Sequence, residues 1–213
     1  MSKPIKKIST LDFGCGDGIK KQAYGPYCSI PWLIENGGTN VVGIEINIDR
    51  IKNIKNIVNN GTHFIICDGC HLPFKDKSFN YVHVEGVLHH IKQYEDGISE
   101  ISRVLNGKLE LTEGISDDFV FNIGRKIVKK WRGDEIAFFK ASILINLLEK
   151  GFVIENSEKF VDFPLFYILC LFDVQPPKLL ILLNNYYRNF IKRTGLLDYF
   201  CSGIKIIAHS KSS

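Results

Sequence analysis

The amino-acid sequence predicts an α/β protein in which helices cover both faces of a parallel sheet. Short apolar runs typical of buried strands alternate along the chain with segments whose apolar residues recur at helical spacing. A glycine-rich turn, from Gly14 to Gly18, directly follows the first apolar run. Such a turn lies at the carboxyl end of the first strand, where α/β sheets bind nucleotide-like cofactors.

The first half of the chain alternates most regularly. Its predicted strands are short and rich in valine and isoleucine, and its predicted helices carry apolar residues on one face. Gly37 and Gly61 are expected to end the first two helices, because glycine readily closes a helix. In chain order, the predicted elements are strand 8–13, helix 27–36, strand 40–46, helix 49–58, strand 63–67, strand 79–85 and helix 94–105.

The second half of the chain is less regular. A turn is expected at Asn106-Gly107, and Gly151 is expected to end a helix. The predicted elements are strand 108–112, helix 138–150, strand 152–160, helix 178–193 and strand 203–209. About forty residues separate the last two strands, which is far more than a hairpin needs. A helical insertion is therefore predicted before the last strand.

The composition is that of one ordinary domain. The 213 residues are 45% hydrophobic and 23% charged, and the formal net charge is +4. This charge neither requires nor excludes a nucleic-acid partner, because dedicated binders usually carry a denser basic stripe. No apolar leader follows the basic start, and no run reaches the roughly 18 apolar residues of a transmembrane helix. A single cytoplasmic domain over 1–213 is expected.

The six cysteines include a CxxCH pattern from Cys67 to His71. This pattern is typical of haem attachment, and its first part is typical of a redox pair. Both functions place the pair in a loop or at a helix start, whereas Cys67 is predicted to end a strand. We therefore interpret the pattern as a coincidence and expect reduced thiols. No second CxxC pair is present to complete a zinc site.

The glycine turn helps to discriminate between cofactors. A dinucleotide site requires GxGxxG, in which Gly14 and Gly16 fit but Ile19 stands in the place of the third glycine. This departure argues against NAD. Glu45, at the end of the second predicted strand, is suited to a ribose diol because a carboxylate accepts two hydrogen bonds side by side. NAD and S-adenosylmethionine both need such a group, so Glu45 alone does not separate them.

An ordered set of motifs over residues 8 to 113 resembles the class I S-adenosylmethionine-dependent methyltransferases, close to the type 11 group. The motifs are Asp12–Gly18, Gly43–Ile46, Asp68, Leu72–Phe74, Phe79–Val82, Val87–Ile91 and Glu100–Leu105. The resemblance implies a Rossmann-like three-layer sandwich with a mostly parallel, seven-stranded sheet and an antiparallel last strand. It also implies a cofactor-binding half over 1–115 and a substrate half over 116–213, with the insertion at about 162–200.

The resemblance implies S-adenosylmethionine as the cofactor and indicates which residues bind it. Backbone at Gly14 and Gly16 would approach the methionine part, and Asp68 would accept from the adenine amine. For two of the expected residues a purely structural role stays open: Asp12 as the cap of a turn, and Glu85 as a solvated residue at the start of a helix. The full expected set is Asp12, Gly14, Cys15, Gly16, Glu45, Ile46, Cys67, Asp68, Gly69 and Glu85.

Methyl transfer needs alignment more than acid–base chemistry, because the methyl group of a sulfonium is already activated. A general base is needed only for an acceptor that loses a proton in that step. The candidate catalytic residues are Glu85, His89 and His90, with Glu113 as a further carboxylate. Adjacent helical residues diverge by about 100°. We therefore do not expect His89 and His90 to share a metal, and no metal site is predicted.

The acceptor is expected to be a small molecule, and an apolar or lipid-like one is favoured. Enzymes that methylate base nitrogens often carry an Asn/Asp-Pro-Pro-aromatic motif after the fourth strand, where this chain has Val84 to Val87. The alternatives are a nucleic-acid methyltransferase and a cofactor-binding but non-catalytic subunit. An aromatic turn at Tyr24–Tyr27 is either a flap over the cofactor or a surface loop.

The helix predicted at 178–193 combines one broad apolar face with basic residues beside it. The apolar face comprises Leu179, Leu180, Leu183, Tyr186, Tyr187, Phe190 and Ile191, and the residues expected largely off it are Asn184, Asn185, Arg188, Lys192 and Arg193. A basic amphipathic helix can lie on a membrane surface. Three interpretations stay open: a lid over the domain, a homodimer contact and a peripheral membrane contact.

Overall fold

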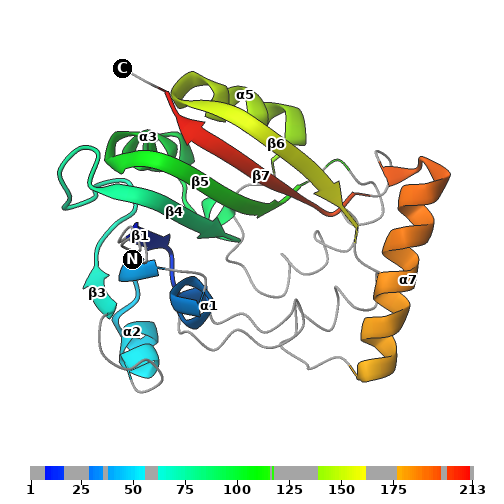
Figure 1. Cartoon of the computed structure of the whole chain (residues 1–213), viewed down its shortest axis with the longest axis horizontal. Helices are drawn as coiled ribbons and strands as arrows, with labels where there is room; N and C mark the ends of the chain where they lie inside the picture. Colours follow the sequence, from blue (N-terminus) through cyan, green and yellow to red (C-terminus); the bar gives the residue numbers. More distant parts are fainter. Residues whose placement is uncertain are drawn as a thin grey trace, which may run out of the picture.

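The computed structural model describes residues 8–16, 29–35, 38–55, 62–115, 117, 139–161, 177–197 and 201–211. They contain a seven-stranded sheet in the order β3-β2-β1-β4-β5-β7-β6, with helices on both sides of it (Figure 1). The strands are β1 (Ile8–Phe13), β2 (Gly38–Glu45), β3 (Thr62–Ile66), β4 (Phe79–Glu85), β5 (Leu105–Gly114), β6 (Phe152–Phe160) and β7 (Gly203–Ser210). The predicted α/β sandwich is confirmed.

The direction of the strands also agrees with the prediction. Strands β3, β2, β1, β4 and β5 pair in parallel, whereas β7 lies between β5 and β6 and is antiparallel to both. The carboxyl ends of the parallel strands therefore meet at one edge of the sheet, which we call the carboxyl edge. Ligands of open α/β sheets bind at this edge.

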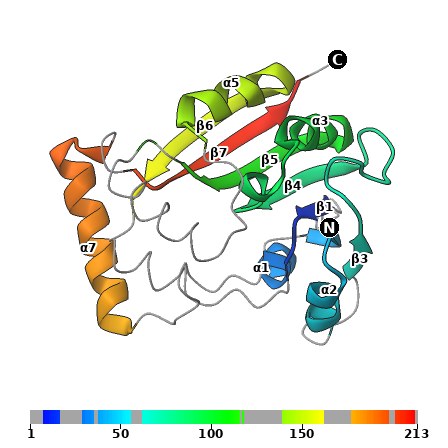
Figure 2. The same cartoon turned by 180° about the vertical axis from the view of Figure 1, so that it is seen from behind.

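Most of the described helices belong to two separate apolar clusters, one on each face of the sheet. The described helices are α1 (Ser29–Glu35), α2 (Ile48–Lys55), the short 3-10 helix η2 (Leu88–His90), α3 (Tyr94–Val104), α5 (Ala141–Gly151) and α7 (Lys178–Thr194). Helices α3 and α5 contribute to the larger cluster and α1 and α2 to the smaller one, whereas Ile191 of α7 packs in a third cluster with Val161. The views from both sides show this division (Figures 1 and 2).

Strand β4 shows how one strand serves two different faces. Side chains alternate along a strand, and Val82 and Val84 are fully buried in the cluster that contains α3 and α5. Tyr81 and His83 point to the opposite face, where the ring of His83 lies 6.0 Å from that of Trp32 in α1. The apolar face stabilises the sandwich, and the other face is available for polar groups.

The turn predicted at Asn106-Gly107 is wrong. Strand β5 already begins at Leu105, directly after α3, and Gly107 lies within it. A Cβ atom at Gly107 would lie 2.2 Å from the carbonyl oxygen of Asn80 in β4. The glycine thus allows β4 and β5 to approach each other closely at a shift in their register. An Asn-Gly pair in the sequence does not show whether the glycine serves such a contact or a turn.

Arg103 ties the segment between β3 and β4 to helix α3. Its guanidinium donates to the carbonyl oxygens of Phe74 (2.7 Å) and Leu72 (3.1 Å) and to the carboxylate of Glu100 (2.7 and 2.8 Å). Glu100 also accepts from the backbone N–H of Leu72. The hydrogen bond from Arg103, which outweighs burial, holds the pKa of Glu100 below its usual value.

Replacing Arg103 by methionine is expected to lower the free energy of unfolding by about 2 kcal/mol, because several charge-assisted hydrogen bonds are lost. The depressed pKa makes the contribution of Glu100 complete above about pH 4.3, and that contribution is lost as the pH falls further. The difference between wild type and Arg103→Met should therefore shrink in acid. Urea unfolding at several pH values measures it. Lys52→Met, which removes an exposed ion pair with Asp49, is the control and should cost far less.

Candidate cofactor and catalytic site

The turns that follow β1, β2 and β3 meet at the carboxyl edge. The backbone N–H of Gly16 donates to Oε2 of Glu45 (3.1 Å), and the N–H of Cys15 donates to the carbonyl oxygen of Ile44 (2.8 Å). The N–H of Cys67 donates to the carbonyl oxygen of Glu45 (3.2 Å). Three motifs that lie far apart in the sequence are thereby placed next to one another.

Two glycines of the first turn have positive φ angles, 76° at Gly14 and 65° at Gly16. Their surroundings differ. A Cβ atom at Gly14 would lie 2.6 Å from both methyl groups of Val87, whereas one at Gly16 would have no atom of the described residues within 4 Å. Among the residues that the structure describes, the backbone of Gly16 therefore borders open space, which a bound molecule can approach closely.

The carboxylate of Glu45 faces this turn and is engaged by three backbone donors. Besides Gly16, the N–H groups of Ile46 (2.9 Å) and Asn47 (3.0 Å) donate to Oε1. A carboxylate offers about four acceptor positions, so a ribose diol has to replace at least one of these bonds. The bond from Gly16 comes from across the turn. The open space and the carboxylate together fit the ribose and methionine parts of S-adenosylmethionine.

Two exposed side chains border the same edge beyond Glu45. Ile46 is 70% exposed, and Asp68 is also exposed, with one carboxylate oxygen accepting from the N–H of Cys70 (2.9 Å). Gly69 lies against Phe13, whose ring a Cβ atom at Gly69 would approach to 2.5 Å. An apolar side chain beside a carboxylate is suited to a purine, because the first can pack on the ring and the second can accept from the amino group.

Cys15 differs from the other expected residues of this site. Its side chain is buried in the cluster with Ile30 and Leu33 of α1. Only its backbone reaches the carboxyl edge. A contact between this residue and a cofactor is therefore limited to main-chain atoms.

The environment of Cys67 and Cys70 argues against redox chemistry. The prediction that Cys67 ends a strand is wrong, because β3 ends at Ile66 and both cysteines lie in the following loop. Only the properties of the thiols themselves therefore argue against redox chemistry. Burial, reinforced by the charge of Asp68, raises the pKa of each thiol to about 11. Both thiols are protonated at neutral pH and are therefore poor nucleophiles.

Asp12 and Glu85 lie on either side of a buried histidine. Nδ1 of His83 is 3.1 Å from Oδ1 of Asp12, and Nε2 is 3.7 Å from Oε2 of Glu85. Glu85 is the last residue of β4, rather than a residue at a helix start. His83 is not among the candidate site residues predicted from the sequence. The pattern Tyr81-His83-Glu85, alternating with valines, is the sequence signal that indicates a polar face here.

The polar face continues across the sheet to β7. Glu110 of β5 accepts from the hydroxyl of Tyr81 (2.8 Å) and forms an ion pair with Lys205 of β7 (2.6 Å). Burial raises the pKa of Glu110, but the hydrogen bonds from Lys205 and Tyr81 outweigh burial and bring the pKa below its usual value. Burial, followed by the charge of Glu110, raises the pKa of Tyr81. Near neutral pH, Glu110 is therefore ionised and the hydroxyl of Tyr81 keeps its proton.

His89 is oriented by Glu113, at the carboxyl ends of β4 and β5. Nδ1 of His89 contacts Oε1 of Glu113, and Oε2 accepts from the N–H groups of Val87 (3.2 Å) and Leu88 (2.9 Å). The Glu113 side chain is fully buried, so it is unsuited to act as a base on a substrate. A carboxylate beside Nδ1 keeps the proton on that nitrogen, which leaves the lone pair on Nε2.

His90 is exposed, and its ring centroid lies 4.0 Å from that of His89. Within the described residues, no group of three histidine, cysteine, aspartate or glutamate side chains is arranged to hold a metal ion. The expected aromatic flap at Tyr24–Tyr27 lies outside the described residues, as do Gly18 and Ile19.

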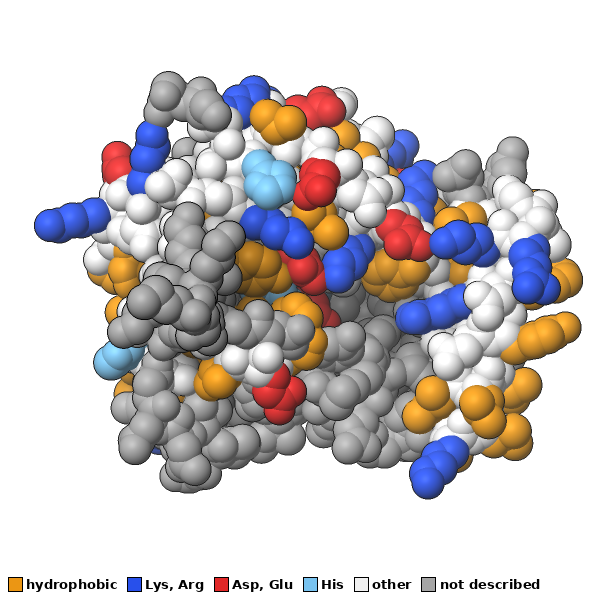
Figure 3. Space-filling model, viewed as in Figure 1, with side chains coloured by type: hydrophobic (Ala, Val, Ile, Leu, Met, Phe, Trp, Pro, Cys, Tyr) orange, Lys and Arg blue, Asp and Glu red, His pale blue; other side chains and the backbone are white. Residues whose placement is uncertain are grey.

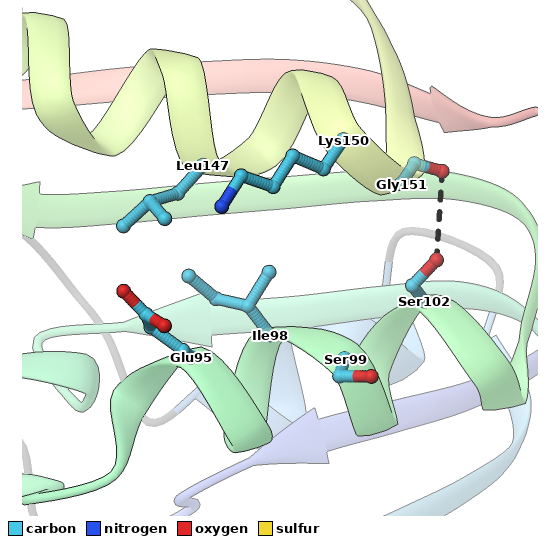
Figure 4. Close-up of a pocket in the computed structure, with 7 residues that line it drawn as sticks. All are labelled: Glu95, Ile98, Ser99, Ser102, Leu147, Lys150 and Gly151. Carbon is cyan, nitrogen blue, oxygen red and sulfur yellow. Dashed lines mark hydrogen bonds between the residues drawn. The ribbon is translucent and has the colours of Figure 1, made fainter.

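A second concave region lies between helices α3 and α5. It has a volume of about 400 Å³ and is lined by Glu95, Ile98, Ser99, Ser102, Leu147, Lys150 and Gly151. Figure 4 shows these side chains on the facing sides of the two helices, with the hydroxyl of Ser102 donating to the carbonyl oxygen of Gly151 (3.5 Å). None of the expected site residues lines this cleft.

Comparisons with known proteins agree with the predicted fold and with the resemblance to methyltransferases. Residues 11–108 match the methyltransferase domain family that corresponds to the type 11 group. A crystal structure of an S-adenosylmethionine-dependent methyltransferase from Mesorhizobium loti superposes with a TM-score of 0.68 over 98% of this chain and 93% of that chain, at 15% identity. This likeness confirms the fold.

Two curated relatives match shorter stretches. A sterol 24-C-methyltransferase of Schizosaccharomyces pombe is 34% identical over 125 residues, which are 55% of this chain and 30% of the relative. A probable tRNA methyltransferase 9B of Mus musculus is 30% identical over 97 residues, which are 44% of this chain and 18% of the relative. The chain thus spans less than a third of the length of either relative.

Proposed function

Because residues 11–108 form a methyltransferase domain and the chain has the fold of S-adenosylmethionine-dependent methyltransferases, we propose that the protein methylates a small-molecule acceptor. This fold family uses S-adenosylmethionine as its cofactor. The observation that carries the proposal is the open space beside Gly16, which the carboxylate of Glu45 borders. Bound there, the cofactor supplies a sulfonium methyl group that is activated for displacement.

The proposed cofactor site combines residues from the turns that follow β1, β2 and β3 at the carboxyl edge. The backbone of Gly14, Cys15 and Gly16 and the carboxylate of Glu45 hold the methionine and ribose parts. Ile46, Cys67, Asp68 and Gly69 surround the adenine. Asp12 and Glu85 lie on the side of β4, where His83 is within hydrogen-bond distance of Asp12 and 3.7 Å from Glu85.

For an acceptor that loses a proton, we propose His89 as the general base. Its contact with the buried Glu113 fixes the ring and the tautomer, so Nε2 can take a proton from the acceptor. Glu113 is a positioning residue. Glu85 and His90, which border the same edge, are the further catalytic candidates. Proximity of acceptor and methyl group supplies the remainder of the acceleration.

The acceptor is proposed to be a small, apolar or lipid-like molecule. The match to a sterol methyltransferase supports a lipid-like acceptor, whereas the match to a probable tRNA methyltransferase supports the nucleic-acid alternative. A formal net charge of only +4 over 213 residues favours the first of these. We propose a cytoplasmic single domain in which residues 1–115 bind the cofactor and 116–213 supply the acceptor side.

Gly16→Ala is expected to weaken S-adenosylmethionine binding by about tenfold or more, because the added methyl group enters the space that the ligand needs. Gly195→Ala is the matched control. Both glycines have a positive φ angle, and no atom of the described part of the chain lies within 4 Å of the added Cβ, so both variants should lose about 1 kcal/mol of stability. Isothermal titration calorimetry should show weaker binding for Gly16→Ala alone. Equal affinities would remove Gly16 from the cofactor site.

The overall function is tested by calorimetry with S-adenosylmethionine, followed by incubation of the protein and cofactor with a cell extract. We expect saturable cofactor binding and a metabolite that gains the mass of one methylene group. A folded protein that binds no cofactor would overturn the proposal. Cofactor binding without transfer to any extract fraction would support the non-catalytic alternative, and methylated RNA would support the nucleic-acid alternative.

A further inference from the structure

Helix α7 has two apolar edges that face different ways. One edge is buried and contains Leu180, Asn184 and Ile191, with Ile191 packed against Val161. The other edge is exposed and comprises Leu179, Leu182, Leu183, Tyr186 and Phe190, which are between 46% and 73% exposed. The single broad face predicted from the sequence is therefore wrong. Asn184 belongs to the buried edge, and Leu182 joins the exposed one.

Contacts with strand β6 fix the orientation of α7. Arg188 donates to the carbonyl oxygen of Val161 (3.1 Å), and its guanidinium lies 5.7 Å from the centroid of the Phe160 ring. Lys192 forms an ion pair with Glu158 (2.9 Å). Because these contacts hold the buried edge against the domain, the exposed edge is directed away from it. A lid function for the exposed edge is therefore disfavoured.

The charges of α7 are all positive. The helix contains Lys178, Arg188, Lys192 and Arg193 and no acidic residue. Two of these cations contact β6, whereas Lys178 and Arg193 are exposed near the two ends of the apolar edge. At a rise of about 1.5 Å per residue, they lie about 22 Å apart along the axis. Figure 3 shows hydrophobic side chains along the outer side of this helix, with basic side chains close by.

Helix α7 lies on the same side of the molecule as the candidate site. In both ribbon views the helix stands apart from the sheet, on the side to which β4 and β5 point (Figures 1 and 2). The candidate cofactor and catalytic residues follow the ends of the same parallel strands. A surface bound by α7 would therefore lie on the side of the molecule at which the acceptor is proposed to enter.

We propose that the exposed edge of α7 binds the surface of a membrane that contains anionic lipids. Apolar and aromatic side chains enter the boundary between headgroups and acyl chains, and Lys178 and Arg193 contact lipid phosphates. A second copy of the chain is a poorer partner, because pairing two such helices would bring like charges together. The inference deepens the proposed function by giving a lipid bilayer as the source of the acceptor. Within the described residues, no helix has the length and hydropathy to span a bilayer, so the contact is with the surface.

The test is flotation of the full chain with vesicles of phosphatidylcholine, alone or mixed with phosphatidylglycerol. Wild type is expected to float with the mixed vesicles and much less with phosphatidylcholine alone. Tyr186→Glu should reduce the bound fraction by about tenfold, since a charge replaces an inserted ring. The matched control is Asn185→Glu, which adds the same charge at the neighbouring, exposed position outside the apolar edge and should float like wild type.

A second variant tests the electrostatic part. Lys178→Glu combined with Arg193→Glu should abolish the preference for anionic vesicles without touching the apolar edge. S-adenosylmethionine binding, measured on every variant, reports the fold and the proposed function separately from flotation. Failure of wild type to float would overturn the membrane inference, as would equal loss in Asn185→Glu. A dimer in sedimentation velocity that Tyr186→Glu dissociates, without vesicle binding, would assign the edge to self-association instead.

Discussion

Replacing Glu113 by alanine is expected to lower the free energy of unfolding by about 3 kcal/mol. The side chain is fully buried and accepts from the N–H groups of Val87, Leu88 and Gly114 as well as contacting His89. Removal of the carboxylate leaves these donors buried without an acceptor. Because two of the donors, Val87 and Leu88, belong to the segment after β4, the loss also frees the segment that carries the proposed base.

Urea unfolding of the purified variants measures this effect. The exposed pair of Glu155 and His209, whose side chains are 2.9 Å apart, provides a matched control because it has the same chemistry at the surface. Glu155→Ala is expected to cost less than about 1 kcal/mol. The loss in free energy of unfolding for Glu113→Gln should lie between those of the two alanine variants. Glutamine keeps one carbonyl acceptor, but its amide group directs a donor towards other donors. A cost for Glu113→Ala as small as that for Glu155→Ala would show that the buried carboxylate does not hold this segment.

Replacing His89 by asparagine is expected to reduce methyl transfer by about 10²- to 10⁴-fold, the usual contribution of a general base. S-adenosylmethionine affinity should be unchanged, because the histidine acts on the acceptor. Initial rates with the acceptor identified from the extract measure the first effect, and calorimetry with S-adenosylmethionine measures the second.

His209→Asn is the control for this experiment, because His209 also pairs with a carboxylate, that of Glu155, but does so at the surface and away from the carboxyl edge. Its rate should stay within a few-fold of wild type. An unchanged rate for His89→Asn would mean that the acceptor does not lose a proton in the transfer step, and His89 would then serve only to pack η2. If His89→Asn lowered the affinity for S-adenosylmethionine but left the rate unchanged, His89 would be assigned to the cofactor site instead.

The local periodicity of the sequence predicts the strands and helices because it reflects which side of each element is buried. The boundaries of β1, β4 and β6 agree with the prediction, and the other predicted elements differ at their ends by a few residues. The turn predicted at Asn106-Gly107 failed because glycine has two uses, in turns and at close strand contacts. Asn184 was misplaced because polarity alone does not show which helix edge meets β6.

The arrangement of the cofactor site could be predicted from the sequence, since parallel strands bring the residues after Phe13, Glu45 and Ile66 to a single edge. The interactions of the catalytic candidates could not. The contact of His83 with Asp12 depends on the register of β4 against β1, and that of His89 with Glu113 depends on the turn after β4. Such contacts join residues more than twenty positions apart, and no local pattern records them.

The sequence by itself therefore determined the α/β sandwich, the glycine turn and the carboxylate of Glu45, because periodicity, backbone freedom and charge are properties of short segments. Only the tertiary structure decided that Gly16 borders open space while Gly14 packs against Val87. It also decided that Glu113 is buried as the support of His89 and that α7 presents Tyr186 to the outside. Burial depends on what the rest of the chain places beside a residue, which is why these features appear only once the chain is folded.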